Sequence, residues 1–245
     1  MKGKTHCTIG ILSSIQACIL FKLPINLSTL VVSAILSLLP DLDEQNSTIS
    51  NFFVKKKTSQ LIFKFMIYAI NISIFFVSLK INDNFYISSL ITFIAIAIVE
   101  RKLSYSHLRK LLLSFMFILL ALCLYLTKFN IYFVISIALL SIFPWLKHRG
   151  FSHSIIAIFV IRFFLKQIEI IYDIDNLTFI GTVSYASHIF LGDLFTKAGV
   201  PLFYPVSTKK YSLFHSRVGS FWSNTFEIFI VVFLIVAIVF TLFNF

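Results

Sequence analysis

Repeated long apolar runs limit what this chain can fold into more than any other feature. A run of roughly 20 apolar residues crosses a bilayer as an α-helix, whereas the strands of a barrel alternate with a period of two. The sequence has the runs and lacks the alternation. We therefore predict an all-α, polytopic membrane helical bundle with one helix for each run. The nine runs cover residues 7–21, 27–40, 61–79, 85–99, 111–126, 130–146, 154–171, 177–196 and 226–244.

The charges fit a membrane chain better than a nucleic-acid-binding one. The formal net charge is +11, although only 13% of the residues are charged. The basic residues stand between the apolar runs and form no continuous basic face, so we expect no nucleic-acid partner. With a cytoplasmic N-terminus, sixteen of the 21 lysines and arginines fall on the cytoplasmic side, as the positive-inside rule requires. We predict a multi-pass protein of the inner or plasma membrane, with one domain over residues 1–245.

The most polar heptapeptide, HRGFSHS, lies between two apolar runs. It contains two imidazoles, His148 and His153, with Arg149 between them. Polar clusters of this kind in membrane chains mark functional sites, because burying them is costly. Gly150 predicts a turn into the following helix, and Ser152 is a candidate for the cap of that helix. We predict that both histidines bind a metal ion.

Other uncommon polar residues fall near the corresponding ends of their apolar runs. Under the topology above, each lies at the cytoplasmic end of a helix or within about two turns of it. We therefore expect them to meet in one water-accessible pocket beneath the inner leaflet. They are His6, Asp41, Asp43, His188, Asp193 and Glu227, together with the two histidines of the heptapeptide.

These residue types indicate a divalent metal and hydrolytic chemistry. Imidazole with carboxylate suits zinc, manganese or ferrous iron, since magnesium and calcium sites are built from oxygen ligands. Asp41 and Asp43 would share one side of the chain if the segment after Pro40 is extended. A bound divalent ion lowers the pKa of its water to about 7. Glu227 or an aspartate would accept the proton, and Arg149 would contact a phosphate group.

Plainer explanations remain open for several of these residues. Asp41 and Asp43 would also serve as a solvated helix end, and Glu227 suits a helix start through the helix dipole. A single histidine in a membrane more often bonds a neighbouring helix than a metal ion. We assign His107 and His215 to solvated loops.

Four sequence blocks resemble the YdjM-type family, whose members are described as inner-membrane, metal-dependent hydrolases. The blocks are Thr5-His6 with Gly10, LLPDLDEQNS, HRGFSHS and YASHIFLGDLFTKAGVPLFYP, and they cover about half of the chain in the family's order. The resemblance implies a helical membrane fold with a metal site. It implies as site residues His6, Asp41, Asp43, His148, His153, His188 and Asp193, and on a weaker match Glu227.

The chain departs from the family pattern at three places. Gln45 stands where a proline is common, and residues 61–146 resemble an insertion of four helices between the blocks. The third departure is the spacing of His188 and Asp193, which are five residues apart here and four apart in the family. A regular helix would rotate Asp193 about 140° away from His188. We therefore predict a π-bulge near Leu191-Gly192 that restores the shared face.

The sequence favours a divalent-metal-dependent hydrolase at the cytoplasmic membrane face, with zinc or manganese as the cofactor. A membrane lipid or a lipid-linked phosphoester is the expected substrate class. Two alternatives stay open. A transporter would place charges and broken helices at the midplane of the membrane. A regulatory protein would hold the metal in a closed, structural site. Nothing in the sequence indicates the oligomeric state.

Overall fold

The structure is a computed structural model that describes residues 1–102, 104–214 and 217–244, so His215 lies outside the described residues. The described residues form an all-α bundle, with an isolated β-bridge between Val200 and Tyr211. Its α-helices are α1 (Gly3–Leu20), α2 (Leu27–Leu38), α3 (Thr48–Phe53), α4 (Lys56–Asn82), α5 (Phe85–Lys102), α6 (Tyr105–Leu126), α7 (Ile131–Leu140), α8 (Ile155–Tyr172), α9 (Leu177–Ser187) and α10 (Phe221–Asn244).

Nine of these helices correspond to the nine predicted apolar segments, and α3 is the additional one. Short polar residues fix several helix starts: the side chain of Asn26 caps α2 and that of Ser154 caps α8. His107, which we expected in a loop, lies in the first turn of α6 and is exposed. Short 3-10 segments span Leu39–Asp43, Phe143–Trp145, Phe151–His153 and Asp193–Phe195, and a π-helical turn spans His188–Gly192.

Small residues bring α1, α2 and α9 close together. A Cβ built on Gly10 would lie 2.3 Å from the Cβ of Ser37, so only glycine fits on α1 at this crossing. The hydroxyl of Ser184 on α9 donates to the carbonyl of Ser33 on α2. Helices inside membranes pack through small residues and such hydrogen bonds, because apolar burial adds little driving force there.

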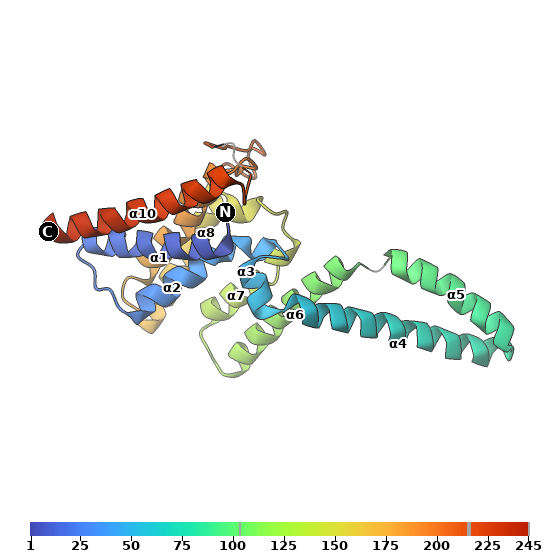
Figure 1. Ribbon diagram of the computed structural model, residues 1–245. Coiled ribbons are helices and arrows are strands. Elements are labelled where there is room, and N and C mark those ends of the chain that lie inside the picture. Colours follow the sequence, from blue (N-terminus) through green and yellow to red (C-terminus); the bar gives the residue numbers. More distant parts are fainter. Residues whose placement is uncertain (103, 215–216, 245) are drawn as a thin grey trace.

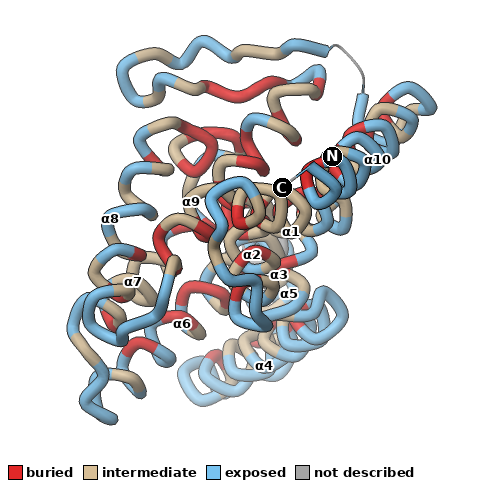
Figure 2. The backbone as a smooth tube through the Cα atoms, turned by 90° about the vertical axis from the view of Figure 1, so that its left-hand side faces the viewer, coloured by how far each residue is buried: buried red, intermediate tan, exposed pale blue. Residues whose placement is uncertain are grey.

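The helices α4 and α5 form an antiparallel hairpin that projects from the body, here named the α4–α5 arm (Figure 1). The arm leaves the body in the direction opposite to that in which α1 and α10 run (Figure 1). Most of α4 is exposed (Figure 2). By contrast, α6 and α7 pack within the body, where Ser114 donates to the carbonyl of Ser141. The predicted four-helix insertion over residues 61–146 thus comprises the α4–α5 arm and the helix pair α6 and α7, which packs within the body.

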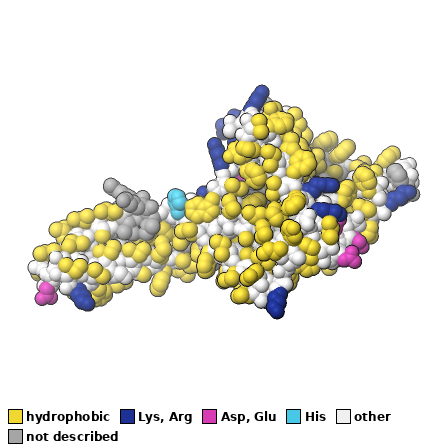
Figure 3. Space-filling model, turned by 180° about the vertical axis from the view of Figure 1, so that it is seen from behind, with side chains coloured by type: hydrophobic (Ala, Val, Ile, Leu, Met, Phe, Trp, Pro, Cys, Tyr) yellow, Lys and Arg dark blue, Asp and Glu magenta, His cyan; other side chains and the backbone are white. Residues whose placement is uncertain are grey.

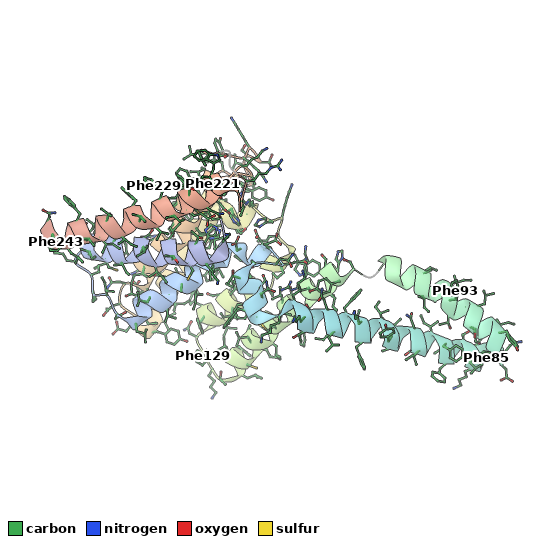
Figure 4. The ribbon with its side chains drawn as sticks, viewed as in Figure 1. Phe85, Phe93, Phe129, Phe221, Phe229 and Phe243 are labelled. Carbon is green, nitrogen blue, oxygen red and sulfur yellow. The ribbon has the colours of Figure 1, made fainter. Side chains whose placement is uncertain are left out.

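Apolar side chains cover much of the face seen in Figure 3, and charged groups gather there in a few places. By length and composition, α4, α6 and α10 could each span a bilayer. The labelled phenylalanines on the arm and along α10, Phe85, Phe93, Phe229 and Phe243 among them, are exposed (Figure 4). Such a surface suits lipid as its surroundings. The number of membrane crossings stays a prediction.

Candidate metal centre

Two histidines and two aspartates meet where α2, α8 and α9 have their ends. The nearest ligand atoms of Asp41, His153, His188 and Asp193 all lie within 4.8 Å of one another. His153 Nε2 is 3.0 Å from Asp193 Oδ2, and His188 Nε2 is 3.6 Å from both Asp193 Oδ2 and Asp41 Oδ1. Asp41 comes from the 3-10 segment after α2, and His153 from the segment before α8. This four-ligand group lies in the interior, with only Asp41 partly exposed.

The π-helical turn brings His188 and Asp193 together. The turn spans His188–Gly192, which confirms the π-bulge predicted from the five-residue spacing. One extra residue in the turn compensates for the rotation that a regular helix would impose on Asp193. Gly192 also makes room for His6, because a Cβ at this position would lie 2.4 Å from the His6 ring.

Hydrogen bonds at Nδ1 fix how both imidazoles point. The Nδ1 of His188 donates to the carbonyl of Ser37 over 2.6 Å, which leaves the lone pair on Nε2. The Nδ1 of His153 lies 2.9 Å from the Ser152 hydroxyl and 3.5 Å from Asp43 Oδ2. Metal-bound histidines in proteins are commonly oriented by such a partner at the second nitrogen. Both Nε2 atoms are therefore directed into the four-ligand group.

The interior of the group fits a divalent cation. The atoms His153 Nε2, His188 Nε2 and Asp193 Oδ2 are buried, and none makes a well-aligned hydrogen bond among the described residues, although His153 Nε2 and Asp193 Oδ2 lie 3.0 Å apart as an ion pair. Buried polar atoms rarely stay unpartnered, because each costs free energy comparable to a lost hydrogen bond. A cation would satisfy all three, with Asp41 and Asp193 each offering a carboxylate oxygen to it. Two nitrogen and two oxygen ligands are typical of sites for zinc and related transition metals.

The acidic motif has a different backbone from the one we predicted. Residues Leu39–Asp43 form a 3-10 helix and not an extended segment, because Pro40 sits in its first turn and the chain continues from α2. The two carboxylates consequently approach His153 at different nitrogens. Asp41 lies on the Nε2 side, and Asp43 lies on the Nδ1 side. Asp43 also pairs with His148, whose Nδ1 is 2.7 Å from its Oδ1.

His148 and Asp43 thus form a second group with His153, beside the four-ligand group, and these three residues could also hold a metal ion. The metal-ligand role of His148 and Asp43 stays a prediction. The ring centroids of His148 and His153 are 5.6 Å apart. The side chain of His148 is 37% exposed, whereas that of Asp43 is fully buried. The hydrogen-bonded pair of His148 and Asp43 therefore extends from the buried interior of the site to its partly exposed edge.

The heptapeptide makes the turn that Gly150 predicted. A Cβ at Gly150 would lie 2.7 Å from the carbonyl oxygen of Lys147, which excludes larger residues. The cap of α8 is Ser154 and not Ser152 as we predicted. Ser152 points into the site and donates to Asp43, because the 3-10 turn places α8 two residues later. The hydroxyl of Tyr185 holds the turn by donating to the carbonyl of Ser152 over 2.6 Å.

Arg149 is engaged by the protein itself. Its Nη2 donates to Asp193 Oδ1 over 2.8 Å, and its Nη1 donates to the hydroxyl of Thr196. The residue is buried and has a positive φ of 55°, a conformation that non-glycine residues adopt at a cost. These bonds orient the carboxylate of Asp193. A direct phosphate contact by Arg149 stays a prediction.

His6 and Glu227 lie at different distances from the four-ligand group. The ring of His6 stacks on that of His188, with centroids 3.8 Å apart, and its Nε2 is 3.6 Å from Asp193 Oδ1. Glu227 is buried on α10, and its carboxylate accepts hydrogen bonds from Thr5 and Ser223. His6 therefore supports the group directly, whereas the bond from Thr5 to Glu227 joins α1 to α10 and the bond from Ser223 lies within α10.

The neighbouring charges favour a protonated His153 when no metal is bound. Burial alone would lower the pKa of His153, but Asp193 and Asp43 outweigh it and raise the pKa from 6.5 to about 9. Burial raises the pKa of Asp43, but His148 and His153 bring it down to about 2. The imidazolium of His153 thus stabilises the metal-free fold fully below pH 6.5. That contribution is lost as the pH rises through about 9.

Metal binding should therefore compete with a proton on His153. We expect the apparent metal affinity to rise about tenfold for each pH unit up to about pH 9, since Nε2 must be neutral to bind. At pH 7.5, calorimetry in buffers of different ionisation enthalpy should detect about one proton released for each metal ion bound. An affinity that does not change between pH 7 and pH 9 would contradict this.

The roles of several supporting residues could not be predicted from the sequence. Ser37, Ser152 and Tyr185 orient the histidines and the turn. Ser152 and Tyr185 lie in the four sequence blocks, but the sequence predicts Ser152 only as a helix cap and indicates no role for Tyr185. Ser184 and Tyr185 precede His188 by four and three residues, which places all three on one face of a helix. This spacing was the one sequence signal that the face carrying His188 is packed against other elements. The remaining contacts depend on tertiary structure.

Comparison with known proteins identifies one relationship. The model of the family described as YdjM inner membrane protein matches residues 1–245. No curated protein and no solved structure matches the chain. The match agrees with the family suggested by the four sequence blocks, and it accounts for the apolar surface of the helices. Because the match covers the whole chain, this protein belongs to the YdjM family of inner membrane proteins.

Proposed function

We propose that this protein is a metal-dependent hydrolase that acts at the cytoplasmic face of the membrane. The four-ligand group supports this proposal most strongly, because two imidazole nitrogens and two carboxylate oxygens converge within 4.8 Å of one another in the interior. Zinc or manganese is the proposed ion. When bound, the ion would supply an activated water and polarise a phosphoryl or acyl oxygen.

The residues beside the group suggest how a proton is handled. Asp43 accepts a hydrogen bond at His148 Nδ1, which leaves Nε2 of this partly exposed imidazole as the atom that takes up a proton. Arg149 holds Asp193 in place, and Ser152 holds Asp43. A lipid-linked phosphoester is the proposed substrate class, because the helices that carry the site are covered with apolar side chains.

The partial exposure of Asp41 and His148 favours catalysis over a structural metal, because a structural site would be closed on all sides. The position of the group at helix ends disfavours a transporter, in which binding sites lie near the bilayer midplane between broken helices. A regulatory role with a structural metal is the second candidate, and it predicts metal binding without turnover.

Purified protein loaded with zinc or manganese should hydrolyse at least one member of a panel of phospholipids and isoprenoid phosphates. His148→Gln should retain the metal and lower turnover by about 10²- to 10⁴-fold, the usual contribution of a general acid or base. His107→Gln, which changes an exposed histidine on α6, is the matched control and should remain active. Metal-loaded protein that turns over none of the panel would favour the regulatory alternative.

A further inference from the structure

A groove lies between the first turns of α1 and α10. It encloses about 370 Å³ and is separate from the four-ligand group, because α1 turns His6 towards the group and Thr5 towards the groove. The helices start side by side and run in the same direction (Figure 1). Membrane lipids would therefore meet the groove with their headgroups at the helix starts and their chains along the helices.

The polar and apolar residues of the groove are separated along its length. Lys2 and Lys4 line the end at the helix starts, with Asn224 opposite them on α10. Further along α10 the lining becomes apolar, with Ile228 and Val232 exposed. This order matches a phospholipid, whose charged phosphate is joined to apolar chains.

The electrostatics at the polar end favour an anion. Lys2 and Lys4 are exposed. Within the described part of the chain no side chain caps the N-terminus of α1, and no acidic residue lies in its first turn. The helix dipole adds partial positive charge at that point. One carboxylate, Glu227, lies on the floor of the groove, where the hydroxyls of Thr5 and Ser223 donate to it. The two lysines outnumber this carboxylate.

We infer that this groove binds one anionic membrane phospholipid, with its phosphate at Lys2 and Lys4 and an acyl chain along Ile228 and Val232. The inference does not depend on the proposed hydrolase activity. A lipid bound there would cover the apolar side of α10 and hold the first turn of α1. That turn leads directly into His6, which stacks on His188.

Native mass spectrometry of the full-length protein in detergent would test the inference, with phosphatidylglycerol as the probe. Each lysine close to an anionic lipid contributes roughly fivefold in affinity, so Lys2→Gln with Lys4→Gln should weaken binding roughly 25-fold. Val232→Trp should also weaken binding, because the indole would occupy the apolar part of the groove. Diacylglycerol and glycerol 3-phosphate, which each lack one half of the ligand, should bind far more weakly.

Another groove supplies a matched control. Lys57 and Lys64 line it between α4 and α6, so Lys57→Gln with Lys64→Gln removes the same charge elsewhere. This variant should bind phosphatidylglycerol like the wild type. Equal loss in both double variants, or equal binding of glycerol 3-phosphate and phosphatidylglycerol, would overturn the inference. Because the readout is binding, an inactive protein would still give a clear answer.

Discussion

Replacing His153 with alanine should abolish metal binding by the purified protein. Its Nε2 belongs to the four-ligand group, and its Nδ1 faces Asp43, so the change removes one ligand and one of the partners of each of two buried carboxylates. The binding free energy of structural zinc is about 10–16 kcal/mol, or roughly 3 kcal/mol for each of four ligands. The loss of one ligand should therefore lower the metal affinity more than about 100-fold. Metal analysis after dialysis against a chelator would measure this loss.

His107→Ala is the control for this change, because it removes an exposed imidazole that is not part of either group. Circular dichroism should show the same helix content for both variants, which separates loss of the site from loss of the fold. A His153→Ala protein that keeps its metal at wild-type affinity would show that the four-ligand group is not the metal centre.

Lengthening the π-helical turn by one residue should have an equally large effect, whereas shortening it by one residue should have a small one. Inserting one alanine after Phe190 rotates Asp193 by about 100° relative to His188. The carboxylate would leave the four-ligand group, so metal affinity should again fall by more than about 100-fold. Metal titration of the purified variant would measure this loss.

Deleting Phe190 should be tolerated much better. A π-helical turn is an α-helix with one extra residue, so the deletion leaves His188 and Asp193 four residues apart in a regular α-helix. Both side chains would still lie on one face, and the partly exposed Phe190 ring contributes little to the core. We expect metal affinity to stay within about tenfold of the wild type, which is the smaller end of the effect of substitutions that support metal ligands without binding the metal. Equal loss from the deletion and the insertion would contradict this account of the turn.

Much of the helix content could be predicted from the sequence, because apolar runs of membrane length leave few alternatives. The helix α3 could not, since six residues of mixed polarity carry no periodic signal. Its segment is held by a tertiary contact, in which the buried Arg109 donates to Asn51 and to the carbonyl of Val54. The direction in which the α4–α5 arm leaves the body also depends on packing and not on composition.

The site shows the same division. The positions of the polar residues at helix ends indicated that His153, His188 and Asp193 would meet, and the five-residue spacing indicated the π-helical turn. The sequence did not indicate that Asp41 and Asp43 approach opposite nitrogens of one imidazole, because that depends on the 3-10 backbone after α2. Nor did it indicate that the guanidinium of Arg149 is engaged by Asp193.

The ligands of the four-ligand group come from three stretches of chain that are more than thirty residues apart in sequence. A bound ion would act as a cross-link that is added only after all the helix ends have reached their places. Chains without the metal would keep their helices but lack this cross-link, so they would open more readily to membrane proteases. Metal supply would set how long each molecule survives in the cell, in addition to whether it is active.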